Sequence, residues 1–155
     1  MTSAVQVFRE KFSTDIVGRG KILAERTLLR RLNRTDSAFV QVEVMHTLTI
    51  MDPYQYFKSY VPELILKMDH YDSTVSTMSY QSLKDIGEHG NTRAWQARIV
   101  FNTLRKNLFL SRNKLASLTE PDQRIKDKID LVRWALKILG SQEIPRLPKE
   151  VINWL

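Results

Sequence analysis

The stretch TEPDQRIKDKIDLVRWALKILG, residues 119–140, gives the clearest indication of the fold. Apolar side chains recur in it at intervals of three and four residues, which is the spacing of one buried stripe on an α-helix. The stripe consists of Ile125, Ile129, Val132, Leu136 and Leu139. A second apolar face in its later half consists of Leu131, Trp134 and Ile138. We therefore expect this helix to lie at the centre of the core.

The ends of this helix are also marked. Thr119 or Glu120 can cap its first turn, Pro121 suits a first helical turn, and Gly140 supplies a left-handed stop. Upstream, the same periodicity predicts a short helix at the start, around Val5, Phe8 and Phe12, and then longer helices over 21–34, 54–68, 72–87 and 92–110.

Connecting segments are expected between these helices. Asn91 is the candidate cap of the helix over 92–110, and a short loop or turn is expected at 115–118. Gly18-Arg19-Gly20-Lys21 has exposed amides and a nearby lysine, as in a phosphate loop. It lacks the Walker spacing, so we interpret it as a break between helices.

Residues 38–51 are ambiguous. Valines and other apolar residues alternate with polar ones, which normally favours a strand. However, Asp36 and Ser37 are good helix caps, and Asp52-Pro53 terminates helices. A lone strand in an otherwise helical chain would leave its backbone groups without partners. We therefore favour a helix, which would make the chain all-α.

The helices then follow one another as antiparallel pairs, 21–34 with 36–51, 54–68 with 72–87 and 92–110 with 121–139. Pro62-Glu63-Leu64 through Asp72, Val75, Leu83 and Ile86 resembles a HEAT or armadillo-type unit. A second set of residues resembles the pattern of the second helix of such a unit: Asp130, Val132, Arg133, Ala135, Leu136 and Leu139. The resemblance covers about residues 36–140 and implies a binding surface formed by successive helices, without intrinsic catalysis. The expected fold is a single all-α domain, residues 1–155, with six to seven helices. It is a short α-solenoid or an irregular bundle.

Composition narrows the class of protein. The chain has 155 residues and no cysteine, which excludes disulfides and thiolate metal sites. Met1 to Glu10 lacks the features of a signal peptide, and no stretch approaches eighteen consecutive apolar residues. We expect no membrane insertion and an intracellular location, cytoplasmic or nuclear.

Charge is distributed unevenly along the chain. The net charge of +7 combines +5 in residues 1–35, −5 in 36–91, +7 in 92–137 and zero in the last eighteen residues. A basic chain of this kind attracts polyanions such as nucleic acid or acidic protein segments.

Two groups of basic residues are the candidate binding sites. Arg26, Arg30 and Arg34 repeat every four residues, with Arg31 alongside. Arg98, Arg105 and Arg112 are seven apart, so on one helix they form a ridge, extended by Lys106 and Lys114. Tyr54 and Tyr56 are candidate aromatic contacts to a partner.

No motif for catalysis is present. The histidines at 46, 70 and 89 have no metal-box spacing, and no nucleophile motif is found, so we expect neither metal nor cofactor. An enzyme with a dispersed active site stays an alternative. The leading hypothesis is a non-enzymatic helical adaptor that binds an acidic protein partner or nucleic acid. A dedicated RNA- or DNA-binding protein, such as a genome-packaging factor, is the first alternative.

The apolar C-terminal tail, residues 141–155, completes the prediction. It either docks on the domain as a final short helix or inserts into another chain, which includes a second copy of this one.

Overall fold

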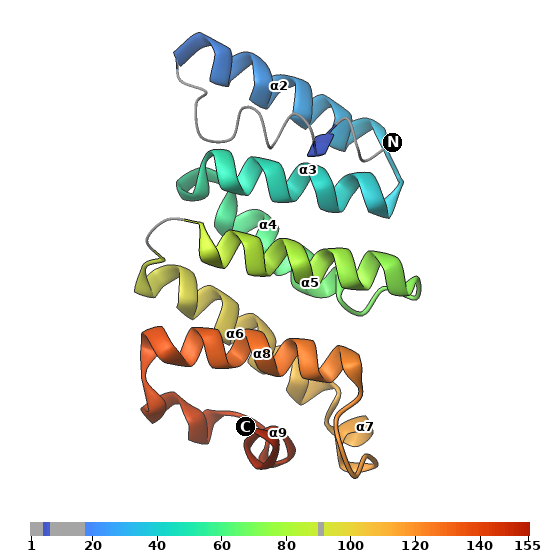
Figure 1. Ribbon diagram of the computed structural model, residues 1–155, viewed down its shortest axis with the longest axis vertical. Coiled ribbons are helices and arrows are strands. Elements are labelled where there is room, and N and C mark those ends of the chain that lie inside the picture. Colours follow the sequence, from blue (N-terminus) through green and yellow to red (C-terminus); the bar gives the residue numbers. More distant parts are fainter. Residues whose placement is uncertain (1–4, 7–17, 90–91) are drawn as a thin grey trace. The chain divides into compact units, whose positions relative to one another are not determined.

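The computed structural model describes residues 5–6, 18–89 and 92–155 (Figure 1). The described residues form helices and connecting segments without a strand, and the long helices pack as antiparallel pairs. The prediction of an all-α fold built from helix pairs is therefore confirmed. Contacts between helices divide the chain into two compact units, Met1–His89 (unit 1) and Gly90–Leu155 (unit 2).

Unit 1 is built around one central helix. Its helices are α2 (Gly18–Arg34), α3 (Ala38–Met51), α4 (Pro53–Lys67) and α5 (Ser73–Glu88). Helix α3 packs against α2, α4 and α5, and α4 also packs against α5 (Figure 1). Val5, which is helical, packs on the cluster between α2 and α3. The rest of the short helix predicted around Val5, Phe8 and Phe12 lies outside the described residues.

The burial of α3 explains its ambiguous sequence. Val40 and every residue from Val42 to Thr49 are buried, so the helix has no solvent-facing side over most of its length. A helix buried all round does not need the 3.6-residue pattern of a surface helix. The hydroxyls of Thr47 and Thr49 donate to the carbonyls of Glu43 and Met45, at 2.9 and 2.7 Å. These bonds satisfy polar groups that would otherwise be costly to bury.

Aspartate side chains cap the starts of α4 and α5. The Asp52 carboxylate accepts from the Gln55 N–H at the start of α4, and the Asp72 carboxylate accepts from the Thr74 N–H at the start of α5. The expected break at Gly18-Arg19-Gly20 is wrong, because these residues form the first turn of α2.

Unit 2 is a helix pair with the C-terminal tail packed on it. Helices α6 (Ala94–Leu110) and α8 (Gln123–Leu139) form the pair, and the short helix α7 (Arg112–Ala116) follows α6. In the tail, the 3-10 helix η1 (Ser141–Arg146) packs on α8, and α9 (Lys149–Trp154) packs on α7. Both Leu147 and Val151 of this tail are buried.

The core of unit 2 follows the stripe predicted for α8 at Ile125, Ile129 and Val132, whereas Leu136 and Leu139 are only partly buried. Fully or nearly fully buried side chains include Ala97, Phe101, Leu104, Leu108, Ile125, Ile129 and Val132. Of the second face predicted for α8, Leu131 is buried but Ile138 is exposed. Lys128 is buried as well, and its Nζ donates to the Asn107 Oδ1 of α6 at 2.7 Å, which gives the charged group a polar partner inside the pair.

Three local predictions in unit 2 need correction or remain open. The loop expected at 115–118 is wrong in part, because Leu115 belongs to α7 and is buried. The expected cap at Thr119 or Glu120 is also wrong. The cap of α8 is Asp122, whose Oδ1 accepts from the Ile125 N–H at 3.0 Å. Asn91, the candidate cap of α6, lies outside the described residues.

Gly140 ends α8, and its backbone cannot accept a side chain without strain. Its φ of 104° and ψ of 160° lie in a region that only glycine adopts readily, and an added Cβ would collide with the Gln142 side chain. We expect Gly140→Ala to lower the free energy of unfolding by about 1–3 kcal/mol. Urea unfolding followed by circular dichroism measures this, because the helical signal also reports on unit 1, where the control position Gly20 lies.

The matched control for this variant is Gly20→Ala. Gly20 lies in α2, and nothing is within 4 Å of the position that its Cβ would take. Alanine at a helical glycine stabilises by about 0.5–1 kcal/mol. Equal effects of the two substitutions would contradict the structure at Gly140.

Candidate functional site

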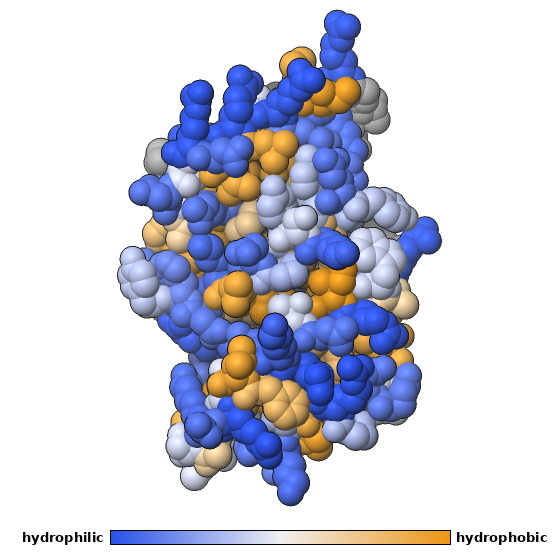
Figure 2. All heavy atoms as spheres, turned by 180° about the vertical axis from the view of Figure 1, so that it is seen from behind, coloured by the Kyte–Doolittle hydropathy of each residue, from blue (hydrophilic) through white to orange (hydrophobic). Residues whose placement is uncertain are grey.

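The first predicted basic group lies on α2. Arg26, Arg30 and Arg34, which we call the α2 arginine row, are all exposed. Residues four apart on a helix are neighbours, and their positions along the axis differ by about 6 Å. No ion pair joins these three arginines to a carboxylate of the described residues. Figure 2 shows hydrophilic side chains projecting along the edge where Figure 1 places α2. Arg31 is also exposed, alongside the row.

The single carboxylate of α2 is engaged elsewhere. Glu25 accepts a hydrogen bond from the Tyr56 hydroxyl at 3.0 Å, and its carboxylate lies 3.9 Å from the Lys21 Nζ. Lys21 also lies 3.5 Å from Asp52, so it is held by two acids. The carboxylate that could have neutralised the α2 arginine row is therefore directed to other partners.

The two predicted aromatic contacts have different surroundings. Tyr54 is 71% exposed, at the start of α4. Tyr56 is only 5% exposed and stacks on Tyr60, with ring centroids 5.5 Å apart. Burial, followed by the hydrogen bond to Glu25, raises the pKa of Tyr56 well above its usual value. Tyr56 is therefore a packing residue of unit 1, and of the two tyrosines only Tyr54 is exposed for the predicted contact with a partner.

The second basic group is engaged with the C-terminal tail. The Arg98 guanidinium lies 3.8 Å from Glu143, and the Arg112 guanidinium lies 3.6 Å from Glu150. Between them, the Arg105 Nε donates to the carbonyl of Arg146 at 2.7 Å. Helix α6 ends at Leu110, as predicted, and Arg112 begins α7. The ridge therefore contacts the tail at three points along its length.

The two lysines next to the ridge differ from each other. Lys114, exposed on α7, lies 3.6 Å from the carboxylate of Asp122, the cap of α8. Lys106 is exposed on α6 and forms no hydrogen bond or ion pair with the described part of the chain. It lines an open groove on unit 2 with a volume of about 460 Å³.

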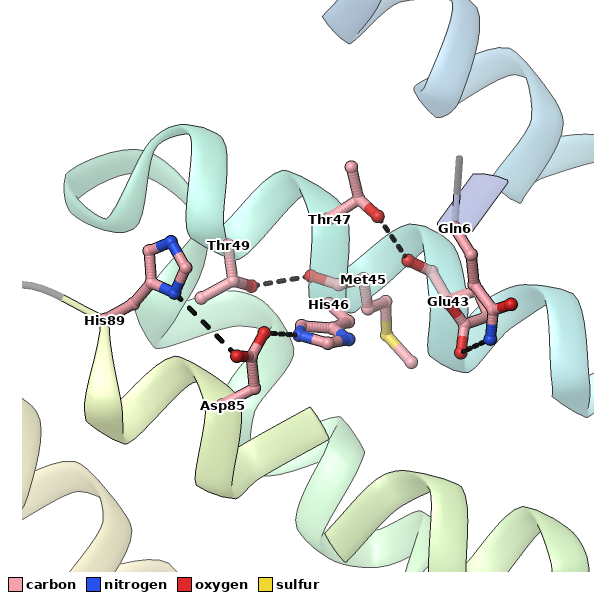
Figure 3. Close-up of polar contacts among 8 residues, drawn as sticks. All are labelled: Gln6, Glu43, Met45, His46, Thr47, Thr49, Asp85 and His89. Atoms are coloured by element: carbon pink, nitrogen blue, oxygen red, sulfur yellow. Dashed lines mark hydrogen bonds and ion pairs between the residues drawn. The ribbon is translucent and has the colours of Figure 1, made fainter. Parts of the chain in front are cut away.

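Unit 1 also contains a polar cluster that the sequence did not reveal. The buried His46 Nε2 lies 2.6 Å from the Asp85 Oδ2, and the Asp85 Oδ1 lies 3.8 Å from the His89 Nδ1 (Figure 3). His46 belongs to α3, and Asp85 to α5, so the contact joins two helices. The partners are 39 residues apart in sequence, and their side chains meet only because α3 and α5 pack together.

We expect Asp85→Ala to lower the free energy of unfolding by about 1 kcal/mol, because the buried His46 ring loses a hydrogen-bond partner. This loss is at the lower end of the range of about 1–3 kcal/mol for a buried group that loses its partner. The reason is that the Asp85 side chain is 45% exposed, so solvent screens its charge. Urea unfolding followed by circular dichroism measures it. Glu63→Ala, at an exposed position of α4, is the control and should change little. A loss as large in the control would contradict a specific role for Asp85.

These polar groups form no metal centre. Within residues 5–6, 18–89 and 92–155, no three histidine, aspartate or glutamate side chains come together in a way that could hold a metal ion. In the same ranges, no helix combines the length and the hydropathy needed to cross a bilayer.

Comparison with known proteins adds no relative: no family model matches the chain, and no curated protein or solved structure is significantly similar to it.

Proposed function

We propose that this chain is a non-enzymatic helical interaction module whose basic surface binds an acidic protein partner. The observation that carries the proposal is the α2 arginine row. Its three guanidinium groups are exposed and have no ion pair with the described residues, whereas two of the three ridge arginines lie close to glutamates of the tail. Exposed cations on one helix face attract an acidic surface and steer its approach.

The composition of this face supports a protein partner over nucleic acid. Ile22 and Leu23 are both more than half exposed, and each lies three or four residues before Arg26. Arginines next to apolar side chains are typical of protein interfaces. Surfaces that bind single-stranded nucleic acid typically combine basic residues with aromatic side chains on which bases stack, and α2 contains no aromatic residue.

The arrangement of helices is a second support. In α-solenoids of the HEAT and armadillo type, stacked antiparallel helix pairs form extended concave surfaces that bind partners. Residues 36–140 resemble such repeats, and α2 pairs with α3, α4 with α5 and α6 with α8. Both features support a role in binding a partner.

The test is a binding titration of the full chain with fluorescein-labelled poly-L-glutamate and, separately, with a single-stranded oligouridylate of equal charge, each at two salt concentrations. We expect polyglutamate to bind more tightly, and Arg26→Glu/Arg30→Glu to weaken that binding about tenfold or more. The control Lys58→Glu/Lys137→Glu changes the net charge equally at exposed positions of α4 and α8.

The two ligands separate the hypotheses. Tighter binding of the RNA, lost in the α2 double variant, would support a nucleic-acid-binding protein and overturn the acidic protein partner. An equal loss of polyglutamate binding in the control would show that net charge alone is responsible, and would remove the α2 arginine row from the account.

A further inference from the structure

We infer that the groove on unit 2 is a docking site for a short acidic peptide segment with a hydrophobic anchor. This inference names a contact site and a peptide class for the partner proposed above, and to that extent rests on the proposed function. The residues that line the groove are Asn102, Arg105, Lys106, Phe109, Leu110 and Arg146. They belong to α6 and η1 and include none of the α2 arginine row.

Two neighbouring rows of α6 make the floor of the groove. Asn102, Lys106 and Leu110 follow one another every four residues, and Arg105 and Phe109 form the adjacent row. Rows of this spacing leave a shallow groove between them on a helix surface. Arg146 of η1 supplies the remaining wall, so docking of the tail helps to shape the site.

Arg105 is held in place before any ligand arrives. Its Nε donates to the Arg146 carbonyl at 2.7 Å, and its guanidinium carbon lies 5.1 Å from the centroid of the Phe109 ring. The two terminal nitrogens form no hydrogen bond with the described residues. A guanidinium fixed in this way can receive a carboxylate through both terminal nitrogens without further loss of side-chain entropy.

The charges of the groove select an acidic ligand. Arg105, Lys106 and Arg146 are basic, and no carboxylate is among the lining residues. Arg146 is partly balanced by Glu143, at 2.8 Å, whereas Lys106 has no partner in the described part of the chain. Lys106 and Arg105 together therefore present the positive charge that is available to a ligand.

The other end of the groove is apolar and accessible. Leu110 is 81% exposed and Phe109 is 37% exposed. Large exposed apolar side chains beside cations are suited to contact an apolar anchor residue of a partner. The distance from Asn102 to Leu110 along the helix is about 12 Å, which matches about four residues of extended peptide. We therefore expect the peptide that binds the groove to contain one or two acidic residues followed, within four positions, by a large apolar residue.

The test is selection from a display library of random twelve-residue peptides on the immobilised full chain. The most enriched peptide is then labelled and measured by fluorescence anisotropy against wild type, Lys106→Glu and Leu110→Asp. The control is Lys137→Glu, an exposed lysine on α8 of the same unit. Nuclear magnetic resonance mapping of the peptide on the wild-type chain locates the contact.

We expect enriched peptides with the acidic and apolar pattern, amide shifts at Lys106 to Leu110, and about tenfold weaker binding to each groove variant. Lys137→Glu should stay within about twofold of wild type. The inference is overturned if the selected peptides lack this pattern, map elsewhere, or bind the groove variants as tightly as wild type. Failure of this test with retained polyglutamate binding by α2 would leave the proposed function standing. Loss of polyglutamate binding by α2, with retained peptide binding in the groove, would overturn the proposed function and leave the groove inference standing.

Discussion

Replacing Val44 with aspartate is expected to unfold unit 1. The Val44 side chain is fully buried in α3, and α3 contacts the other three long helices of the unit. A carboxylate there would be shielded from water, and a buried charge without a partner costs about 3–5 kcal/mol. This is a large part of the stability of a typical domain. Circular dichroism should show a loss of helix from unit 1, and urea unfolding should show the lower free energy.

Ile22→Asp is the matched control for this prediction. It exchanges another β-branched aliphatic residue for aspartate, but at an exposed position of α2. Surface substitutions usually change stability by less than about 0.5 kcal/mol. If Val44→Asp were as stable as Ile22→Asp, the burial of α3 on all sides would be wrong.

Replacing Phe101 with alanine is expected to destabilise unit 2 by about 3–5 kcal/mol. Phe101 is fully buried in α6, at the face that packs against α8. Removing its ring takes away apolar contacts and leaves a cavity that close-packed neighbours fill only in part. All three tryptophans lie in unit 2, so urea unfolding followed by tryptophan fluorescence reports the loss directly.

The control for Phe101 is Phe109→Ala. Phe109 is on the same helix but is partly exposed and packs beside Arg105. We expect its removal to cost less than about 1 kcal/mol. A similar loss in both variants would contradict the assignment of the α6 face that is buried.

For the helix at 38–51, the spacing of apolar residues alone did not predict the secondary structure. Its alternating pattern was typical of a strand, yet caps at both ends and the lack of a partner strand favoured a helix, which the structure confirms. The alternation of apolar and polar residues could not distinguish a strand from a helix here. Nearly every position of α3 is buried, so apolar residues are acceptable on all sides of the helix. The flanking residues therefore decided the question correctly, and the side-chain pattern could not.

Local signals failed where several neighbouring residues could serve the same role. Thr119, Glu120 and Asp122 are all near the start of α8, and Pro121 suited a first turn. The structure places the cap at Asp122. Similarly, Leu115 was assigned to a loop because α7 is a single short turn, and its burial depends on packing that local sequence does not specify.

Contacts between residues that are far apart in the sequence could not be predicted from the sequence. The spacing of Arg98, Arg105 and Arg112 was noticed, but nothing near them indicated that tail residues 38 to 45 positions away would lie against the ridge. The contact of His46 with Asp85 was missed for the same reason. Composition therefore located basic residues, and only the packing of helices distinguished arginines held by the tail from those on α2.

The most direct test of this distinction is nuclear magnetic resonance of the arginine side chains during a titration of the wild-type chain with poly-L-glutamate. Our account predicts that the side-chain nitrogen signals of Arg26, Arg30 and Arg34 shift, because these groups are exposed without an ion pair to the described residues. The signals of Arg98 and Arg112, which lie against glutamates of the tail, should change little. Shifts at Arg98 and Arg112 with unchanged signals from α2 would contradict it.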